Sequence, residues 1–154
     1  MTILLSFGLL CLLCAILAWI DIRDGIIPDW LNLAIAGLGL VKIMMTGDLS
    51  AALQAIGEGI AVGGIFWLLR QLYFSYRKIQ GLGLGDVKFL AAAGIWVGIA
   101  GIAPVLLIAT LTALACAGVM QLSGRALTAQ TSLSFGPFLA AGLVLTAGFQ
   151  QYGF

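Results

Sequence analysis

The chain has no histidine among its 154 residues, and only 8% of its residues are charged. Without histidine it can form neither a Ser-His-Asp triad nor a Cys-His pair, and most zinc sites are excluded. Seven basic and six acidic residues give a net charge of +1. Nucleic-acid partners are bound by a concentrated positive surface, and the largest basic cluster here is Arg77-Lys78. We therefore expect no nucleic-acid partner.

Hydrophobic residues make up 62% of the chain, and the mean hydropathy is +1.17. This composition leaves too little polar surface to cover a soluble globule, so it predicts an integral membrane protein in contact with the lipid bilayer. The first uncharged run extends from Ile3 to Ile20. No basic region precedes it and no A-x-A-like site ends it, so we interpret it as a permanent span and not as a cleaved signal.

Apolar runs of spanning length predict an all-α membrane protein with one domain, residues 1–154. About six transmembrane helices are expected, at residues 3–20, 30–46, 58–76, 87–103, 104–122 and 133–150. The fourth and fifth should form a hairpin, with Pro104 in the first turn of the fifth, where its missing N–H has no partner to lose. Residues 47–57 should lie partly at the membrane interface.

The basic residues predict the orientation of the chain. Six of the seven fall in or beside loops on one predicted side of the membrane: Arg23, Arg70, Arg77, Lys78, Lys88 and Arg125. By the positive-inside rule this side is the cytosol, which places both termini outside. Lys42 is the exception and is expected to extend toward the outer interface.

Two aspartates lie at the cytosolic boundary. Asp21 follows the first apolar run, and Asp86 precedes the fourth. An aspartate at the centre of a spanning helix costs roughly 2.5 to 3.5 kcal/mol, so acids near this position are candidates for function. The neighbouring acids have structural explanations, since Asp24-Gly25 is a turn dipeptide and Asp29 after Pro28 suits a helix start. Asp21 could still be a solvated turn acid.

Glycines surround the second aspartate, with Gly81, Gly83 and Gly85 alternating with larger residues. Such a segment does not form a stable helix, and it lets another backbone approach closely. An extended substrate could therefore lie beside Asp86. The alternative is a flexible loop with a helix-capping aspartate. A P-loop is excluded, because the Gly-Lys-Ser/Thr ending is missing.

The residues available permit hydrolysis of the aspartic type. One carboxylate would activate water while the other, protonated, polarises the scissile carbonyl, and the pair should share one proton. We expect no metal and no cofactor. The cysteines, Cys11, Cys14 and Cys116, are expected to be packing residues within apolar helices.

Three segments resemble the type IV prepilin peptidases, membrane-embedded aspartic proteases with a Gly-x-Gly-Asp motif. They are residues 20–32, residues 81–94 and residues 134–140, in the order that the family has. The resemblance implies that Asp21 and Asp86 are the catalytic pair. It also implies that Gly83 and Gly85 shape the second catalytic position.

Two further positions within these segments match the family pattern. Lys88 matches the family's basic residue after the motif aspartate, and it could tune Asp86 or anchor the fourth helix at the headgroups. Gly136-Pro137 matches the last-helix signature and is expected to mark the start of that helix, without a catalytic role.

The implied function is removal of a short basic leader from type IV prepilins or from pseudopilins of type II secretion. Cleavage would follow a glycine, just before the hydrophobic helix of the pilin, at the cytosolic face of a prokaryotic plasma membrane. Longer members have an N-terminal region with paired C-x-x-C motifs that is associated with N-methylation. This sequence does not contain that region, so a peptidase without N-methylation activity is expected. Presenilin-like proteases share Gly-x-Gly-Asp, but their Tyr-Asp and Pro-Ala-Leu motifs do not occur here.

A small proton- or cation-coupled transporter is the alternative function, with Asp21 and Asp86 as an ion relay. Against it, both acids are predicted at the same leaflet, and few polar residues could continue a path across the membrane. The substrate, the oligomeric state and the roles of Asp24, Asp29 and Glu58 stay open.

Overall fold

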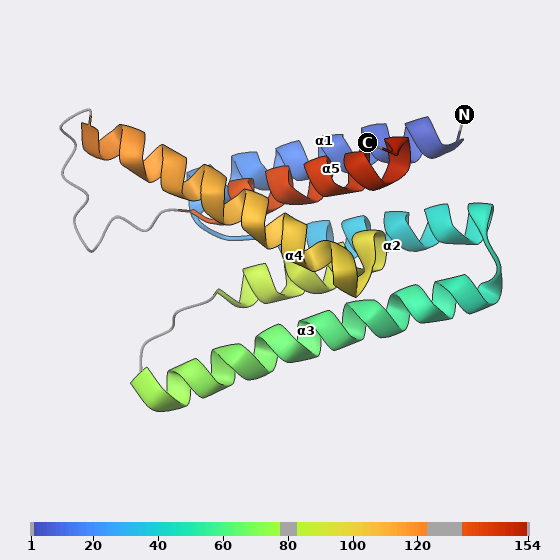
Figure 1. Cartoon of the computed structure of the whole chain (residues 1–154), viewed down its shortest axis with the longest axis horizontal. Helices are drawn as coiled ribbons and strands as arrows, with labels where there is room; N and C mark the ends of the chain where they lie inside the picture. Colours follow the sequence, from blue (N-terminus) through green and yellow to red (C-terminus); the bar gives the residue numbers. More distant parts are fainter. Residues whose placement is uncertain (1, 78–82, 123–133, 154) are drawn as a thin grey trace.

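A computed structural model describes residues 2–77, 83–122 and 134–153, and these residues form a helical bundle (Figure 1). The helices are α1 (Thr2–Asp24), α2 (Asp29–Thr46), α3 (Leu49–Arg77), α4 (Leu84–Leu122) and α5 (Gly136–Tyr152). The first four are long and apolar enough to cross a membrane. The predicted class, an all-α membrane protein, is confirmed.

Helix α4 is interrupted at Gly98, and the chain reverses direction there (Figure 1). Its two halves correspond to the fourth and fifth predicted helices, so the expected hairpin is present. The predicted boundary at residues 103 and 104 was wrong, and Pro104 lies inside the second half. Gly98 has φ +72°, a conformation that side chains disfavour, and no charge marks the position in the sequence.

Three other helix boundaries differ from the prediction. Helix α1 continues through Asp24, so Asp21 lies in its last turn and not after it. Helix α3 begins at Leu49, so residues 49–57, which were expected partly at the interface, form its first turns. Helix α5 begins at Gly136. Leu133, the predicted start of this last helix, lies outside the described residues.

Helix α2 and the first half of α4 pack closely through one aromatic residue. The indole Nε1 of Trp96 donates a hydrogen bond to the carbonyl of Ile35 at 2.8 Å. Gly39 provides the space, because a Cβ there would lie 2.7 Å from this nitrogen. Lys42 was expected to extend toward the outer interface; its Nζ lies 4.9 Å from the centroid of the Trp96 ring, a cation–π contact.

The two termini lie at one end of the bundle, and the last turns of α1, α3 and α4 lie at the other (Figure 1). At the end with the termini, the rings of Phe7 in α1 and Tyr152 in α5 pack edge to face, with centroids 5.9 Å apart. Arg23 and Lys88 lie at the opposite end, in the last turn of α1 and near the start of α4. Lys78 and Arg125 lie outside the described residues. This arrangement agrees with the expected orientation, which stays a prediction.

Candidate active site

Asp21 and Asp86 line one cavity of about 690 Å³. Its walls come from the end of α1, the α1–α2 connection, the start of α4 and the residues just before α5. The fold therefore brings together the two acids that the sequence singled out, although 65 positions separate them in the chain (86 − 21).

The carboxylate of Asp21 is buried, with 6% of the residue exposed. An acid in the last turn of a helix is close to the negative end of that helix's dipole, which is unfavourable. Asp21 instead meets the positive N-terminus of α5, where the backbone N–H of Gly136 donates to Oδ2 at 2.9 Å. The hydroxyl of Ser134 also forms a hydrogen bond with Oδ2, and its Oγ lies 2.8 Å from the backbone carbonyl oxygen of Asp21. These donors compensate for the burial of the acid.

Gly136 permits this contact because it has no side chain. A Cβ at this position would lie 2.3 Å from Oδ2 of Asp21 and 3.2 Å from Ile27. Pro137 follows in the first turn of α5, where a missing N–H costs nothing. The Gly-Pro pair thus starts the helix and leaves space for the aspartate.

Asp86 is the third residue of α4, and in this first turn an acid complements the positive end of the helix dipole. Gly83 is close to the acid, since a Cβ there would lie 3.3 Å from Oδ2. A Cβ on Gly85 would lie 2.9 Å from Cβ of Ile27, so this glycine lets α4 approach the α1–α2 connection.

Lys88 does not line the cavity that holds the aspartates. Its Nζ lies 2.7 Å from each carboxylate oxygen of Asp29, which joins α4 to the start of α2. The prediction considered tuning of Asp86 or anchoring at the headgroups, and it missed this ion pair. Asp24 is exposed at the end of α1, 3.9 Å from Arg23.

Ser134 and the N–H of Gly136 are the site groups that sequence reasoning missed. Both were recognised as part of a helix-start signature, but their contact with Asp21 was not expected. A Gly-Pro pair before an apolar run does signal a helix N-terminus, and helix N-termini bind anions. Nothing in the sequence says which anion the N-terminus would meet.

The cysteines lie away from this cavity. Cys14 is buried in α1 as predicted, Cys11 is half-buried and Cys116 is exposed on the surface of α4. The packing role predicted for Cys116 therefore has no support within this chain.

The comparisons with known proteins agree with the motifs. A family model described as type IV leader peptidase family matches residues 8–118. A prepilin leader peptidase/N-methyltransferase of Burkholderia pseudomallei is 39% identical over 147 residues, which cover 95% of this chain and 46% of the relative. Relatives of the same name from Xanthomonas campestris and Escherichia coli are each 36% identical, over 91% and 86% of this chain and 49% and 58% of their own length.

The chain spans about half the length of the curated relatives it matches. No solved structure matches it significantly. The comparisons give no support to the alternative of a transporter. The family match covers most of the chain, and the motif aspartates Asp21 and Asp86 both fall inside it. The chain belongs to the type IV leader peptidase family.

Proposed function

We propose that this chain is a membrane-embedded aspartic endopeptidase that removes the leader from type IV prepilins or type II secretion pseudopilins. Asp21 and Asp86 are its catalytic pair. The reaction takes place at the cytosolic face of a prokaryotic plasma membrane. No metal or cofactor takes part in this proposal, and the expected lack of N-methylation activity stays a prediction.

The observation that supports this proposal best is the shared cavity of the two aspartates. Peptide hydrolysis of the aspartic type requires two carboxyl groups on either side of one water molecule, with one proton between them. Asp21 and Asp86 come from separate helix ends and line this one cavity.

The hydrogen bonds at Asp21 suggest which acid is the base. Its Oδ2 accepts from Gly136 N–H and from Ser134. In the part of the chain that the structure describes, no donor is bonded to Oδ1, which is therefore free to accept a proton from water. Asp21 activates the water, and Asp86 donates a proton to the scissile carbonyl oxygen. The water oxygen bonds to the carbonyl carbon and gives a tetrahedral intermediate. The C–N bond then breaks as the amine takes up the proton that Asp21 accepted from water, and Asp86 recovers its proton as the carbonyl forms again.

Asp21→Asn and Asp86→Asn test the assignment. A prepilin with a basic leader is co-expressed with the wild-type chain or with either variant, and the product is followed by gel shift and N-terminal mass. Wild type should remove the leader after its glycine, and each variant should leave it uncut. Loss of a catalytic carboxylate removes about 10⁴-fold or more of the rate.

Asp48→Asn is the matched control, because Asp48 is an exposed acid in the turn between α2 and α3 and does not line the cavity of Asp21 and Asp86. It should cleave like wild type at an equal level in the membrane. Cleavage by either Asp21→Asn or Asp86→Asn would overturn the catalytic pair. Failure of wild type on prepilins and pseudopilins alike would overturn the proposed function.

A further inference from the structure

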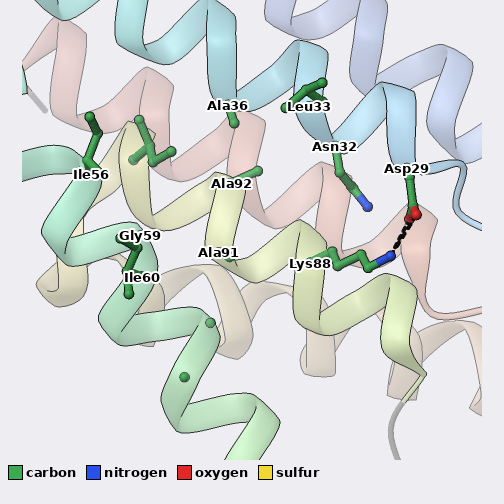
Figure 2. A pocket seen from close by; sticks show the side chains of 13 residues that line it. Asp29, Asn32, Leu33, Ala36, Ile56, Gly59, Ile60, Lys88, Ala91 and Ala92 are labelled. Carbon is green, nitrogen blue, oxygen red and sulfur yellow. Dashed lines mark hydrogen bonds and ion pairs between the residues drawn. The ribbon is translucent and has the colours of Figure 1, made fainter.

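A second cavity, of about 500 Å³, lies between α2, α3 and α4 (Figure 2). We call it the α2–α3 groove. It is lined by residues that include Asn32 and Leu33 of α2, Ile60 and Gly64 of α3, and Lys88 and Ala91 of α4. Leu33 and Ile60 are 75% and 70% exposed, so the groove opens to the outside of the bundle. In a membrane, that side faces lipid or another helix.

The groove begins beside the cavity of Asp21 and Asp86, which we call the catalytic cavity. Ile27 and Asp86 line the catalytic cavity, and Asp29 and Lys88, two residues further along the same two segments, line the groove. From Lys88 it follows α4 to Ile95, a distance of about 10 Å along the helix axis. A chain that leaves the catalytic cavity toward the membrane interior would enter the groove.

Small residues make the groove suitable for a helix. Gly63 is packed against α4, since a Cβ there would lie 2.9 Å from the side chain of Ala91. Gly64 faces open space, with nothing within 4 Å of its Cβ position. Helices associate in membranes through such small residues, because the two backbones can approach closely.

Asn32 gives the groove one polar group without a partner. The residue is 5% exposed, and neither its Nδ2 nor its Oδ1 has a hydrogen-bond partner among the described residues. Figure 2 shows its amide directed toward the ion pair of Asp29 and Lys88 at the end of the groove. A buried amide without partners is unfavourable, and its donor and acceptor together match one peptide unit.

We infer that the α2–α3 groove binds the first turns of the hydrophobic helix that follows the scissile bond of the substrate. Residues of a substrate must leave the helix to enter the catalytic cavity, and this exposes peptide groups that have lost their helical partners. Asn32 pairs with such a group at the point where the substrate leaves the groove. This inference rests on the proposed function.

Site-specific photo-crosslinking tests the position of the substrate. A benzophenone amino acid replaces Leu33 or Ile60 in the full chain with Asp86→Asn, which keeps the prepilin uncut. Both positions should crosslink to the prepilin. Leu12 is the matched control, because it is 57% exposed on α1, which does not line the groove. Equal crosslinking at Leu12, or none at Leu33 and Ile60, would overturn the inference.

Gly64→Leu places a side chain in the groove at a position where a Cβ has nothing within 4 Å, and Gly57→Leu adds the same side chain at an equally open position that does not line the groove. In a chain that keeps Asp86, Gly64→Leu should raise KM for full-length prepilin about tenfold or more, because the added side chain takes the place of part of the substrate helix. A short peptide that lacks the hydrophobic helix should be cut at the wild-type rate. Gly57→Leu should match wild type with both substrates.

Asn32→Leu separates a binding role from a structural one. It should raise KM for full-length prepilin several-fold and should not lower the melting temperature, because it removes an amide without partners. An unchanged KM with a lower melting temperature would overturn the role of Asn32.

If Gly64→Leu reduces co-purified phospholipid and leaves prepilin KM unchanged, the groove is a lipid site and the inference fails. Wild-type cleavage in the same assays tests the proposed function independently.

Discussion

At the scale of the residue, the position of Asp21 depends on groups more than a hundred positions away in the sequence. Its Oδ2 is held by Ser134 and by the N–H of Gly136, at the start of another helix. Both donors point at one oxygen and leave the other for water. We therefore regard Ser134 and Gly136 as positioning residues that act through Asp21.

Ser134→Ala should lower kcat about 10- to 100-fold with little change in KM, because one hydrogen bond to a charged group is worth about 1.5 to 3 kcal/mol. Ser134→Thr keeps the hydroxyl and should restore most of the rate. The measurement is the initial rate of leader cleavage in detergent, with the pH profile recorded for each variant. A profile that is the same for Ser134→Ala and wild type, at equal kcat, would contradict the positioning role.

Gly136→Ala should reduce cleavage more than Ser134→Ala does. The added Cβ would lie 2.3 Å from Oδ2 of Asp21, so either the acid or the start of α5 has to move. Displacement of a catalytic group by about 1 Å can cost about 100-fold in rate. Gly37→Ala is the control, since its Cβ meets nothing within 4 Å. Wild-type kcat for Gly136→Ala would show that this close contact has no catalytic importance.

At the scale of the element, the reversal of α4 at Gly98 is stabilised by side chains from two other helices. Glu58 of α3 accepts a hydrogen bond from Ile99 N–H at 3.2 Å, and Gln150 of α5 donates to the carbonyl of Val97 at 3.1 Å. Gln54 donates to the other oxygen of Glu58 at 2.9 Å. Backbone groups freed by a break in a membrane helix need such partners. Glu58, which had no assigned role from the sequence, is thus a cap for the second half of α4.

Glu58→Ala should lower the melting temperature in detergent by several degrees, because the loss of a helix cap costs about 1 kcal/mol. Glu58→Gln is the matched variant. It keeps an acceptor oxygen for Ile99 N–H and should lose much less. Tryptophan fluorescence during heating gives the measurement. If Glu58→Ala melts at the wild-type temperature, or if both variants lose equally, the cap is not what stabilises the reversal.

At the scale of the whole molecule, the bundle has an apolar outer surface. Large hydrophobic side chains such as Trp19, Leu33 and Leu114 are between 70% and 75% exposed. Exposed apolar area of this kind is typical of a surface that meets lipid. The catalytic cavity lies at one end of the bundle and the two termini at the other (Figure 1).

Labelling of single cysteines with a membrane-impermeant maleimide tests the orientation. Cys11, Cys14 and Cys116 are first replaced by alanine. Asp48→Cys, in the exposed turn between α2 and α3, should then react in intact bacterial cells. Asp24→Cys, beside the catalytic cavity, should react only after the membrane is opened, because the positive-inside rule places it in the cytosol. Labelling of Asp24→Cys in intact cells would reverse the proposed orientation.

The sequence by itself determined the class of the molecule and the candidate catalytic acids. Helix-length apolar runs predict membrane helices because hydrocarbon excludes unpaired backbone groups, and this signal depends only on local composition. The absence of histidine left two boundary aspartates, Asp21 and Asp86, as the candidates for catalysis. The structure places them in one cavity, and the family match includes them both.

Only the tertiary structure decided what each residue contacts. The pairing of Lys88 with Asp29 and the contact of Gly136 with Asp21 join helices that are distant in the chain. The break of α4 at Gly98 likewise depends on Glu58 of α3 and Gln150 of α5. No periodicity or composition within one segment encodes such a partner. Helix packing alone determines which side chain reaches a given helix end, so these contacts could be found only in three dimensions.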